Sequence, residues 1–413
     1  MNKESHSRVW LEIDLGVLQE NYRKMVAAVA PCSVIAVLKA NAYGLGVGAV
    51  AKALVDAGCR QFGVAELNEA LELRALGGGE NSVDRASCPI CSVSDGQDVH
   101  PTEKVVGDAV AVQILGGVLP DEVPAAIEAG VILPITDIEI ARHINRVAGE
   151  LGKIAECQFL VDTGMGRLGV PLENAVALVC EVAELQNLEC EGIYSHFPIA
   201  YRGGDEYTNK QIDDFKSLLE NLAGESIEFS CRHIANSDAI NNFPRAYALP
   251  FNAVRSGINL HGCFDTEGQR ILDIKPALTL KSRLIAVREL SAGDHIGYGC
   301  SYCVPHDMRV GVVAAGYADG LPLALSNTGY LLVSGVPCKV LGRVSMDYTT
   351  ISLEGVDDAT CGDDVICLGG SGEDAVTVED WAEIKNTHPY DIICSFGSRV
   401  ERRYVGRTLN DER

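Results

Sequence analysis

Short apolar runs alternate with runs of helical spacing along the first part of this chain, from residue 32 to about residue 254. The apolar runs have the length of buried strands, and the segments between them place apolar side chains on one face of a helix. The predicted strands include 33–38, 61–65, 155–161, 192–196 and 227–233, and the predicted helices include 47–57, 66–76, 137–151 and 208–222. This alternation is typical of parallel α/β proteins, so we predict an N-terminal (β/α)8, TIM-like barrel.

The spacing changes after residue 262, where short strands follow one another closely with turn residues between them. The predicted strands of this part are 278–287, 310–314, 330–333, 338–341 and 364–368. A short helix at 377–384 and a final strand-like run close the chain. The pattern predicts a C-terminal, mostly β-strand domain.

Two further segments do not follow the alternation of strands and helices. Residues 8–15 alternate apolar and polar side chains, as a half-buried strand does, and Asp14 is placed to cap a following helix. Residues 77–112 are rich in glycine, proline and charge. We predict an insertion near residues 78–112 that forms a surface loop, a lid or a contact surface.

The composition is that of a globular protein and argues against several classes of partner. The chain has 413 residues, enough for two domains, and its 47% hydrophobic and 22% charged residues are typical of a soluble globular enzyme. A net charge of −23 argues against nucleic acid or an anionic membrane as a partner. No apolar run is long enough to span a bilayer, and no secretory signal is visible at the N-terminus.

The 15 cysteines are scattered through predicted strands and helices, which suggests reduced thiols and a cytoplasmic location. Two Cys-x-x-Cys pairs, Cys88/Cys91 and Cys300/Cys303, lie far apart in the sequence and outside any compact knuckle pattern. We therefore predict no metal site.

Lys39 is the first candidate for chemistry, because it follows the predicted buried strand 33–38 and precedes a glycine-broken turn. In α/β barrels the reacting groups gather at the C-terminal ends of the strands. Burial there lowers the pKa of a lysine amine, and a neutral amine can form a Schiff base with a carbonyl cofactor. On spacing alone, a lysine that merely extends to solvent from a strand end is the commoner case. However, residues 37–46, Val-Leu-Lys-Ala-Asn-Ala-Tyr-Gly-Leu-Gly, resemble the pyridoxal-phosphate lysine motif of the alanine racemase family.

Further segments resemble motifs of the same family and follow in the family's order. They are Trp-x-Glu-Ile-Asp-Leu at 10–15, Asp-Thr-Gly-Met-Gly-Arg-Leu-Gly at 162–169, Tyr-Ser-His-Phe at 194–197, His-Ile-Ala-Asn-Ser at 233–237, Val-Arg-Ser-Gly-Ile at 254–258, Gly-Tyr-Gly at 297–299, Gly-Tyr-Ala-Asp-Gly at 316–320, Gly-Arg-Val-Ser-Met-Asp at 342–347 and Gly-Ser-Arg-Val at 397–400. The resemblance covers nearly the whole chain apart from the insertion and the polar ends. It implies a fold-type III enzyme in which the first strand joins the C-terminal domain. The expected division is a cofactor-binding barrel over residues 13–260, and a β domain over residues 261–413 plus 1–12.

The resemblance also implies the reaction. It predicts a racemase that uses pyridoxal 5′-phosphate (PLP) to interconvert L-alanine and D-alanine, a precursor of bacterial peptidoglycan. Racemisation needs one acid/base group on each face of the substrate Cα, and the family match assigns Lys39 and Tyr298 to these roles. Family members form head-to-tail homodimers, so Tyr298 is expected to act in the site of the partner chain.

The remaining site residues follow from the same resemblance. The expected cofactor-binding residues are Lys39, Tyr43, His196, Asn236, Ser237, Arg255, Gly257 and Ile258. The expected substrate-binding residues are Arg167, Tyr298, Tyr317 and Met346. Taken singly, these would be ordinary core histidines, turn formers and solvated arginines. An arginine at the pyridine nitrogen keeps its own proton, which leaves the cofactor a weaker electron sink and suits racemisation rather than transamination.

The sequence departs from the family at a few positions. Leu160 stands where many members carry a carbamylated lysine, Ser256 replaces a proline, and Ser398 replaces a tyrosine on the phosphate side. Because of Leu160 and Ser398, a racemase of serine or of broad specificity is an alternative function. A decarboxylase of basic amino acids and a non-racemising PLP-binding barrel are the remaining alternatives.

Overall fold

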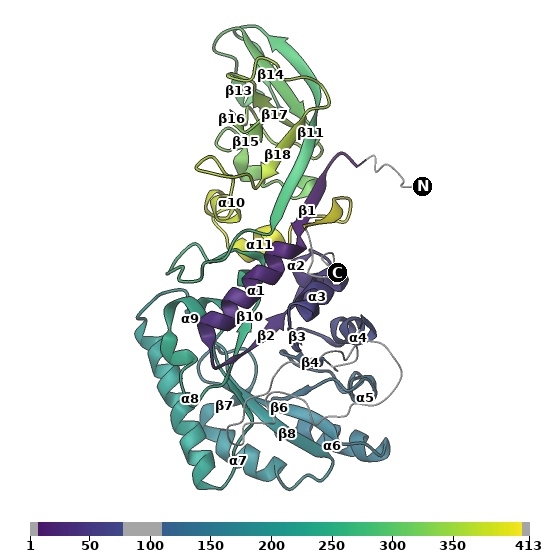
Figure 1. The fold of residues 1–413 in the computed structure, drawn as a ribbon, viewed down its shortest axis with the longest axis vertical. Helices are drawn as coiled ribbons and strands as arrows, with labels where there is room; N and C mark the ends of the chain where they lie inside the picture. Colours follow the sequence, from purple (N-terminus) through teal and green to yellow (C-terminus); the bar gives the residue numbers. More distant parts are fainter. Residues whose placement is uncertain (1–6, 77–109, 407–413) are drawn as a thin grey trace, which may run out of the picture.

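The computed structural model describes residues 7–76 and 110–406, and these form two parts stacked along the long axis of the molecule (Figure 1). A barrel of strands and surrounding helices makes up one part, and a strand-rich domain makes up the other. β1 (Trp10–Asp14) belongs to the sheet of the strand-rich domain, whereas α1 (Leu15–Val29) lies on the barrel. The chain therefore enters the barrel only after contributing a strand to the second domain.

Within the described ranges, eight parallel strands form the barrel. They are β2 (Ser33–Val37), β3 (Gln61–Val64), β4 (Ala111–Ile114), β5 (Leu133–Ile135), β6 (Ala155–Asp162), β8 (Leu188–Tyr194), β9 (Cys231–His233) and β10 (Ala253–Ser256). Their order in the sheet is β4-β3-β2-β10-β9-β8-β6-β5, and the short β7 (Val170–Pro171) pairs with β6. Hydrogen bonds from Ile114 N to Ile132 O and from Ile132 N to Val112 O bring the first and last strands together. The predicted barrel is confirmed.

Helices cover the outside of this barrel (Figure 1). They are α1, α3 (Val47–Asp56), α4 (Leu67–Leu76), α5 (Val123–Glu128), α6 (Ile138–Glu150), α7 (Leu172–Val182), α8 (Glu206–Gly224) and α9 (Ser237–Asn242). In α1, the Asp14 carboxylate accepts from Val17 N at 3.0 Å, and Leu18 and Met25 are buried. The cap and the helical spacing predicted from the sequence are both present.

Two predicted strands have different limits in the structure. Ile227 N bonds to Leu222 O at 2.9 Å and ends α8, so only Cys231–His233 of the run 227–233 reaches the sheet. The strand predicted at 338–341 is β16 (Val336–Lys339) instead. Ser334 and Gly335 both have positive φ, which makes a tight hairpin turn and starts the strand two residues earlier.

The second domain is built on a long strand, β11 (Leu278–Leu290), with a bulge near Ala286. Its sheet has the order β16-β15-β18-β11-β1-β19, and β14 and β17 extend it along β11. The other members are β14 (Met308–Val313), β15 (Tyr330–Val333), β17 (Thr349–Ser352), β18 (Asp364–Leu368) and β19 (Glu401–Val405), with β12 (His295–Ile296) and β13 (Tyr302–Cys303) as a separate pair and α10 (Val378–Lys385) and α11 (Pro389–Ile393) as helices. β1 pairs antiparallel with β11 and parallel with β19, which confirms the strand-rich C-terminal domain and gives it an N-terminal strand.

Some predictions fall partly or wholly outside the residues that the structure describes. Most of the predicted insertion, residues 77–109, lies outside the described residues, as do Cys88 and Cys91, whereas Ala111 and Val112 already belong to β4. Cys300 and Cys303 are exposed, and no cluster of three metal-ligating side chains occurs in the ranges described. No helix in those ranges has the length and apolarity needed to cross a bilayer. The domain limits 13–260 and 261–413 stay a prediction, and β1 runs continuously across the first of them.

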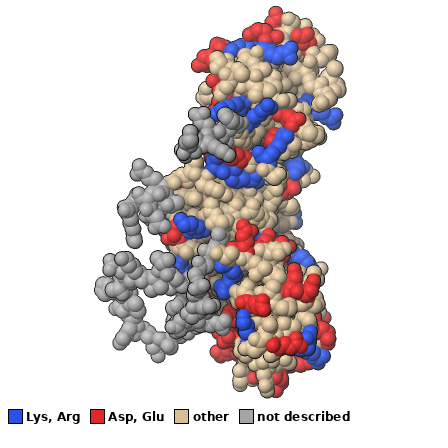
Figure 2. Space-filling view, turned by 90° about the vertical axis from the view of Figure 1, so that its right-hand side faces the viewer, with Lys and Arg blue, Asp and Glu red and all other residues tan. Residues whose placement is uncertain are grey.

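Charged side chains of both signs are interspersed over the face shown in Figure 2, on the barrel and on the strand-rich domain alike. The band between the two parts carries fewer charges on this face. The net charge of −23 is therefore not gathered into one acidic surface there.

Candidate active site

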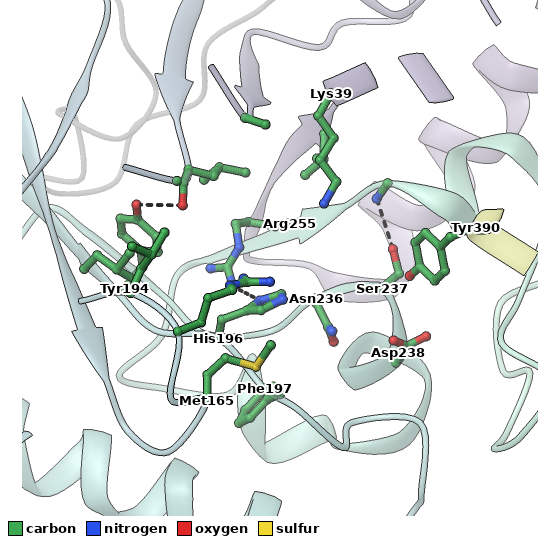
Figure 3. A pocket seen from close by; sticks show the side chains of 18 of the residues that line it. Lys39, Met165, Tyr194, His196, Phe197, Asn236, Ser237, Asp238, Arg255 and Tyr390 are labelled. Carbon is green, nitrogen blue, oxygen red and sulfur yellow. Dashed lines mark hydrogen bonds between the residues drawn. The ribbon is translucent and has the colours of Figure 1, made fainter. Parts of the chain in front are cut away.

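A cavity of about 590 Å³ opens at the C-terminal ends of the barrel strands (Figure 3). Eight of the residues predicted to serve the site line it, namely Lys39, Tyr43, Arg167, His196, Asn236, Ser237, Arg255 and Gly257. Arg255 lies in β10, and the others come from segments that follow β2, β6, β8, β9 and β10. Because the strands are parallel, residues more than 200 positions apart in the sequence meet at one end of the barrel.

Lys39 begins a turn of unusual backbone geometry. The four residues from Ala40 to Tyr43 all have φ between 52° and 60°, so the chain makes a left-handed turn before it reaches Gly44. The sequence predicted a turn broken by the glycines; the left-handed stretch in fact lies on the residues before them. For residues other than glycine this conformation costs about 1–2 kcal/mol each, so neighbouring groups must hold it.

Those groups are visible on both sides of the turn. The Glu69 carboxylate accepts from the backbone N–H of Ala40 and, at 2.8 Å, from that of Ala65 at the end of β3. Asn41 accepts from Val47 N at 2.7 Å at the start of α3. Arg402 of β19 donates to Gly44 O at 2.9 Å. The barrel and the second domain together impose the conformation that aims Lys39 and Tyr43 into the cavity.

The Lys39 side chain is accessible to solvent through the open cavity, but protein atoms crowd its amine. This desolvation lowers the pKa of Lys39, and the positive charges of Arg167 and Arg255 lower it further. A larger fraction of the amine is then neutral at physiological pH than for a free lysine. The geometry suits a nucleophile and a proton acceptor.

Arg255 is buried beside Lys39 and is held by several acceptors. Its guanidinium donates to Ser195 O at 2.7 Å, to Ile234 O at 3.1 Å and to His196 Nδ1 at 3.2 Å. Burial lowers the pKa of Arg255 to about 10, so the group keeps its proton at neutral pH. The cavity therefore contains a fixed cation whose position the backbone determines.

A chain of polar side chains inside the barrel continues from Arg255. The guanidinium also donates to His233 Nδ1, and His233 Nε2 lies 3.0 Å from the Oε1 of Gln158, to which Gln113 donates. Burial lowers the pKa of His233 well below its ordinary value, so the ring is neutral with its proton on Nε2. The sequence motif at 233–237 contains His233 but assigns it no role, and no motif marks either glutamine.

His196 is neutral for the same reason. Burial and the charges of Arg255 and Arg167 lower the pKa of His196 to about 3. Its Nδ1 accepts from Arg255, which leaves the ring facing the cavity near Met165 and Phe197 (Figure 3). The ring is therefore suited to packing against an aromatic group rather than to carrying a charge.

At the other end of the cavity, neutral donors gather around Ser237. Gly257 N donates to Ser237 Oγ at 3.0 Å. The Tyr43 hydroxyl lies so close to Gly257 that an added Cβ would come within 2.0 Å of it. We call Tyr43, Ser237 and Gly257 the donor cluster. Hydroxyl and amide groups in this arrangement bind anions such as phosphate.

Asn236 and Ile258 support this end in other ways. The Asn236 side chain accepts from Ala239 N at 2.9 Å and caps α9, while it also lines the cavity. The side chain of Ile258 is completely buried in the core and is absent from the lining residues of the cavity. A role for Ile258 in the site would rest on its backbone.

Arg167 lies on a turn built by one carboxylate. Asp162 accepts from Gly164 N at 2.8 Å, Met165 N at 2.7 Å and Gly166 N at 2.9 Å. Arg167 itself is exposed to the cavity, and Leu160 contributes an apolar wall nearby. Leu160 is 5% exposed and offers no charge to hold the guanidinium.

Three predicted site residues lie on the second domain and outside this cavity. Tyr298, Tyr317 and Met346 are 72%, 46% and 52% exposed. Tyr317 N bonds to Ser345 O at 3.0 Å, and Gly297 packs on the backbone of Arg343. The three residues therefore share one exposed region of the second domain, which we call the Tyr298 surface.

Four polar lining residues lie outside every motif singled out from the sequence, namely Asp238, Asp265, His388 and Tyr390. Burial and the charge of Asp265 raise the pKa of Asp238 to about 7. Asp238 directly follows Ser237 and could have been found from that motif, whereas nothing near Tyr390 in the sequence marks it. Ser398, which was expected on the phosphate side, is exposed and absent from the lining residues.

Comparisons with known proteins agree with this arrangement. The chain matches the family model of the alanine racemase N-terminal domain over residues 13–264 and that of the C-terminal domain over residues 277–404. The alanine racemase of Desulforamulus reducens is 35% identical over 402 residues, which cover 96% of this chain and 99% of that protein. The alanine racemase of Halothermothrix orenii is 34% identical over 409 residues, with 98% and 99% coverage.

Solved structures show the same fold. Alanine racemase from Streptomyces lavendulae superposes with a TM-score of 0.84 at 29% identity, and the match covers 99% of this chain and all of that one. The Bartonella henselae enzyme, solved with covalently bound pyridoxal phosphate, gives a TM-score of 0.79 at 27% identity, with 97% and 100% coverage. Both domains are matched in order and nearly end to end, and the chain belongs to the alanine racemase family of isomerases.

Proposed function

We propose that this protein is a PLP-dependent racemase that interconverts L-alanine and D-alanine, with Lys39 and Tyr298 as the two acid/base groups. The observation that carries the proposal is one cavity that holds a lysine of lowered pKa, a fixed buried arginine and a cluster of neutral anion donors. These three groups match the aldehyde, the ring nitrogen and the phosphate of PLP. When bound, PLP withdraws electrons from the substrate and acidifies its Cα proton.

In this proposal, residues of the barrel would bind the cofactor, bind the substrate and move one proton. Lys39 would hold the cofactor through its amine and would move a proton on one face of the substrate Cα. Tyr43, Ser237 and Gly257 would bind the phosphate, and Asn236 caps α9 beside them. His196 would pack on the cofactor ring, and Arg167 would bind the substrate carboxylate.

Arg255 would hold the pyridine nitrogen. Its pKa of about 10 leaves the proton on the guanidinium, so Arg255 would donate a hydrogen bond to the ring nitrogen and keep its own proton. A weaker electron sink favours return of the proton to Cα over its loss to other atoms. The chain through His233 and Gln158 keeps the guanidinium aimed at this point.

The second base needs a partner chain. Tyr298, Tyr317 and Met346 lie outside the cavity of their own chain, on the Tyr298 surface. In a head-to-tail homodimer this surface would close the partner's cavity, placing Tyr298 on the face of Cα opposite Lys39. Tyr317 and Met346 would line the substrate entrance.

Chiral analysis of product formed in deuterated water tests the proposal. The PLP-loaded protein is incubated separately with L-alanine and L-serine, and we expect D-alanine with deuterium at Cα to form faster than D-serine. Faster inversion of serine would assign a serine or broad-specificity racemase. Leu160 in the cavity wall is the observation that favours this alternative, because many family members carry a carbamylated lysine there. Release of carbon dioxide would indicate a decarboxylase, and bound PLP with neither inversion nor exchange would indicate a non-racemising protein.

A further inference from the structure

Two cysteines face each other across neighbouring strands of the barrel. β6 and β8 lie side by side (Figure 1), and Cys157 of β6 is the register partner of Cys190 of β8. Their side chains interact through a hydrogen bond, so both thiols lie on the same side of the sheet. Neighbouring strands lie about 4.8 Å apart, which falls within the range of roughly 4.4–6.8 Å that separates the Cα atoms of a disulfide. The backbone therefore already has the spacing that a bond between the two sulfur atoms requires.

We propose that Cys157 and Cys190 are a modification site, at which a mild oxidant such as hydrogen peroxide forms a reversible disulfide that ties β6 to β8 and lowers the activity of the barrel site. The effect on activity rests on the proposed function, whereas the bond itself does not. The Cys190 sulfur takes one oxygen from the peroxide and releases one water, and the Cys157 sulfur then displaces this oxygen as a second water. The two thiols give up two electrons and two protons, and one peroxide becomes two waters.

The surroundings of the two thiols favour this order of steps. Cys157 is 1% exposed, and its contact with Cys190 together with burial raises the pKa of Cys157 well above its ordinary value. The Cys157 thiol therefore stays protonated and out of reach of a dissolved oxidant. Cys190 is half-buried, so an oxidant can reach its sulfur. Cys157 is then already in contact with Cys190 and can complete the bond.

The cysteine pair lies next to the residues that hold Arg255. Gln158 follows Cys157 in β6, and its Oε1 lies 3.0 Å from Gln113 Nε2 and 3.0 Å from His233 Nε2. These two partners come from β4 and β9, which pair with strands other than β6, so Gln158 reaches them through the interior of the barrel. Because successive side chains of a strand point to opposite faces, Cys157 lies on the outer face. One strand thus carries the thiol outside and the support of Arg255 inside.

The pairing of β6 with β8 changes directly after the cysteine pair. Gln158 pairs with Gly192, so Glu191 is an extra residue in β8 and makes a bulge. A Cβ at Gly192 would come within 2.3 Å of Gln158 Cδ, so the glutamine side chain packs directly on the backbone of β8. A disulfide beside this bulge would shift the backbone on which Gln158 rests. The shift would reach Arg255 through His233, which bonds to both.

The test follows the bond and the site in the same samples. PLP-loaded wild-type protein is treated with hydrogen peroxide, the remaining thiols are alkylated, and peptides are identified by mass spectrometry before and after reduction with dithiothreitol. We expect a peptide pair linked through Cys157 and Cys190, a fall in kcat for alanine of roughly 10-fold, and recovery of kcat on reduction. The affinity of the cofactor-free protein for PLP, measured by fluorescence titration, should also fall on oxidation, because Arg255 is displaced.

Variants show whether this pair is responsible. Cys190→Ser and Cys157→Ala each remove one of the two sulfur atoms, and both should keep their kcat and PLP affinity through the same treatment. Cys361→Ser is the matched control, because Cys361 is an exposed thiol of the second domain. Its removal should leave the link and the loss of kcat as in wild type.

Oxidation of Cys361 while Cys157 and Cys190 both remain alkylated would overturn the inference, and so would a linked pair with unchanged kcat and PLP affinity. Either result leaves the proposed function intact, because the reduced enzyme still inverts alanine. A reduced wild-type protein that does not invert alanine would overturn the proposed function, and the link together with the PLP affinity would still decide the inference.

Discussion

The pKa of Lys39 depends on the groups that surround its amine. The side chain alone would be a charged amine, but crowding and the positive charges of Arg167 and Arg255 lower its pKa. Arg255 is fixed by backbone carbonyls at neighbouring strand ends, and the position of Lys39 is fixed by the turn that follows β2. At the scale of single residues, the protonation of the Lys39 amine is therefore determined by the side chains around it.

Lys39→Ala removes the amine that we propose holds the cofactor. We expect loss of racemisation by at least about 1,000-fold, because the variant lacks both covalent attachment and one acid/base group. Mass spectrometry after borohydride reduction should find PLP attached to the wild-type protein and not to the variant. Lys52→Ala on the exposed side of α3 is the control, and a labelled, active Lys39→Ala would contradict the assignment.

Asp238 gives a prediction about pH. Its pKa in the folded protein is raised from the usual 3.8 to about 7, so the folded state binds more protons than the unfolded state between these values. Stability from this group is therefore present below about pH 4 and is lost as pH rises through about 7. Asp238→Asn should be more stable than wild type by about 1–2 kcal/mol at pH 8, after allowance for solvent in the cavity, and the difference should shrink at pH 5.

Urea unfolding of both proteins at the two pH values measures this difference. Asp213→Asn on the exposed face of α8 serves as the control, since its carboxylate pairs with Arg245 on the surface. A stability difference that is the same at pH 5 and pH 8 would show that Asp238 does not titrate as described.

At the scale of elements, the left-handed turn after β2 is the feature that positions the site. Residues 40–43 are held in a costly conformation by Glu69, Asn41 and Arg402. Glu69 is the central contact, because its two oxygens accept from the ends of two neighbouring strand segments. A glutamine at this position could accept only one of these hydrogen bonds.

Glu69→Gln should therefore loosen the turn and displace Lys39 and Tyr43. We expect a loss of about 1–3 kcal/mol in unfolding free energy and a fall in kcat of roughly 10- to 100-fold. Urea unfolding and steady-state racemisation measure the two effects. Glu66 is an exposed neighbour before α4, and Glu66→Gln should change neither the unfolding free energy nor kcat. A Glu69→Gln enzyme with normal kcat would show that the hydrogen bonds of Glu69 do not position the Lys39 amine.

At the scale of the whole molecule, the proposed site is shared between chains. The cavity belongs to the barrel, while Tyr298 lies on the second domain with 72% of its surface exposed. A barrel alone would supply one base and the cofactor site. In the mechanism that we propose, the strand-rich domain would supply the second base to its partner, so the mechanism would require dimerisation.

Mixing two inactive variants tests this sharing. Lys39→Ala and Tyr298→Phe should each be inactive, yet a dimer of one chain of each has one site with both bases intact. After unfolding and refolding of an equal mixture, half the dimers are mixed, and activity should return to about a quarter of wild type, as expected for a symmetric two-site dimer. Recovery confined to the refolded mixture is the expected result, and no recovery despite mixed dimers would place Tyr298 in its own chain's site.

Much of the architecture could be predicted from sequence because local burial leaves a periodic trace. The alternation of strand-length and helical runs predicted the barrel, and close-spaced strands predicted the second domain. Asp14 and the spacing that follows it predicted α1. Motifs around Lys39, Ser237 and Arg255 marked strand ends that do line the cavity.

The order of residues along the chain indicates which segments are buried, with what period, and which of them end in polar or charged side chains. Which distant residues meet depends on the packing of whole elements: Tyr390 and Asp265 lie at the donor cluster, Gln158 and His233 lie behind Arg255, and Tyr298 lies outside the cavity of its own chain. The left-handed turn belongs with these, since Glu69 and Arg402 impose it from other elements. Periodicity reports whether a residue is buried, whereas pairing across the barrel and between domains depends on how whole elements pack, and no stretch of neighbouring residues contains that information.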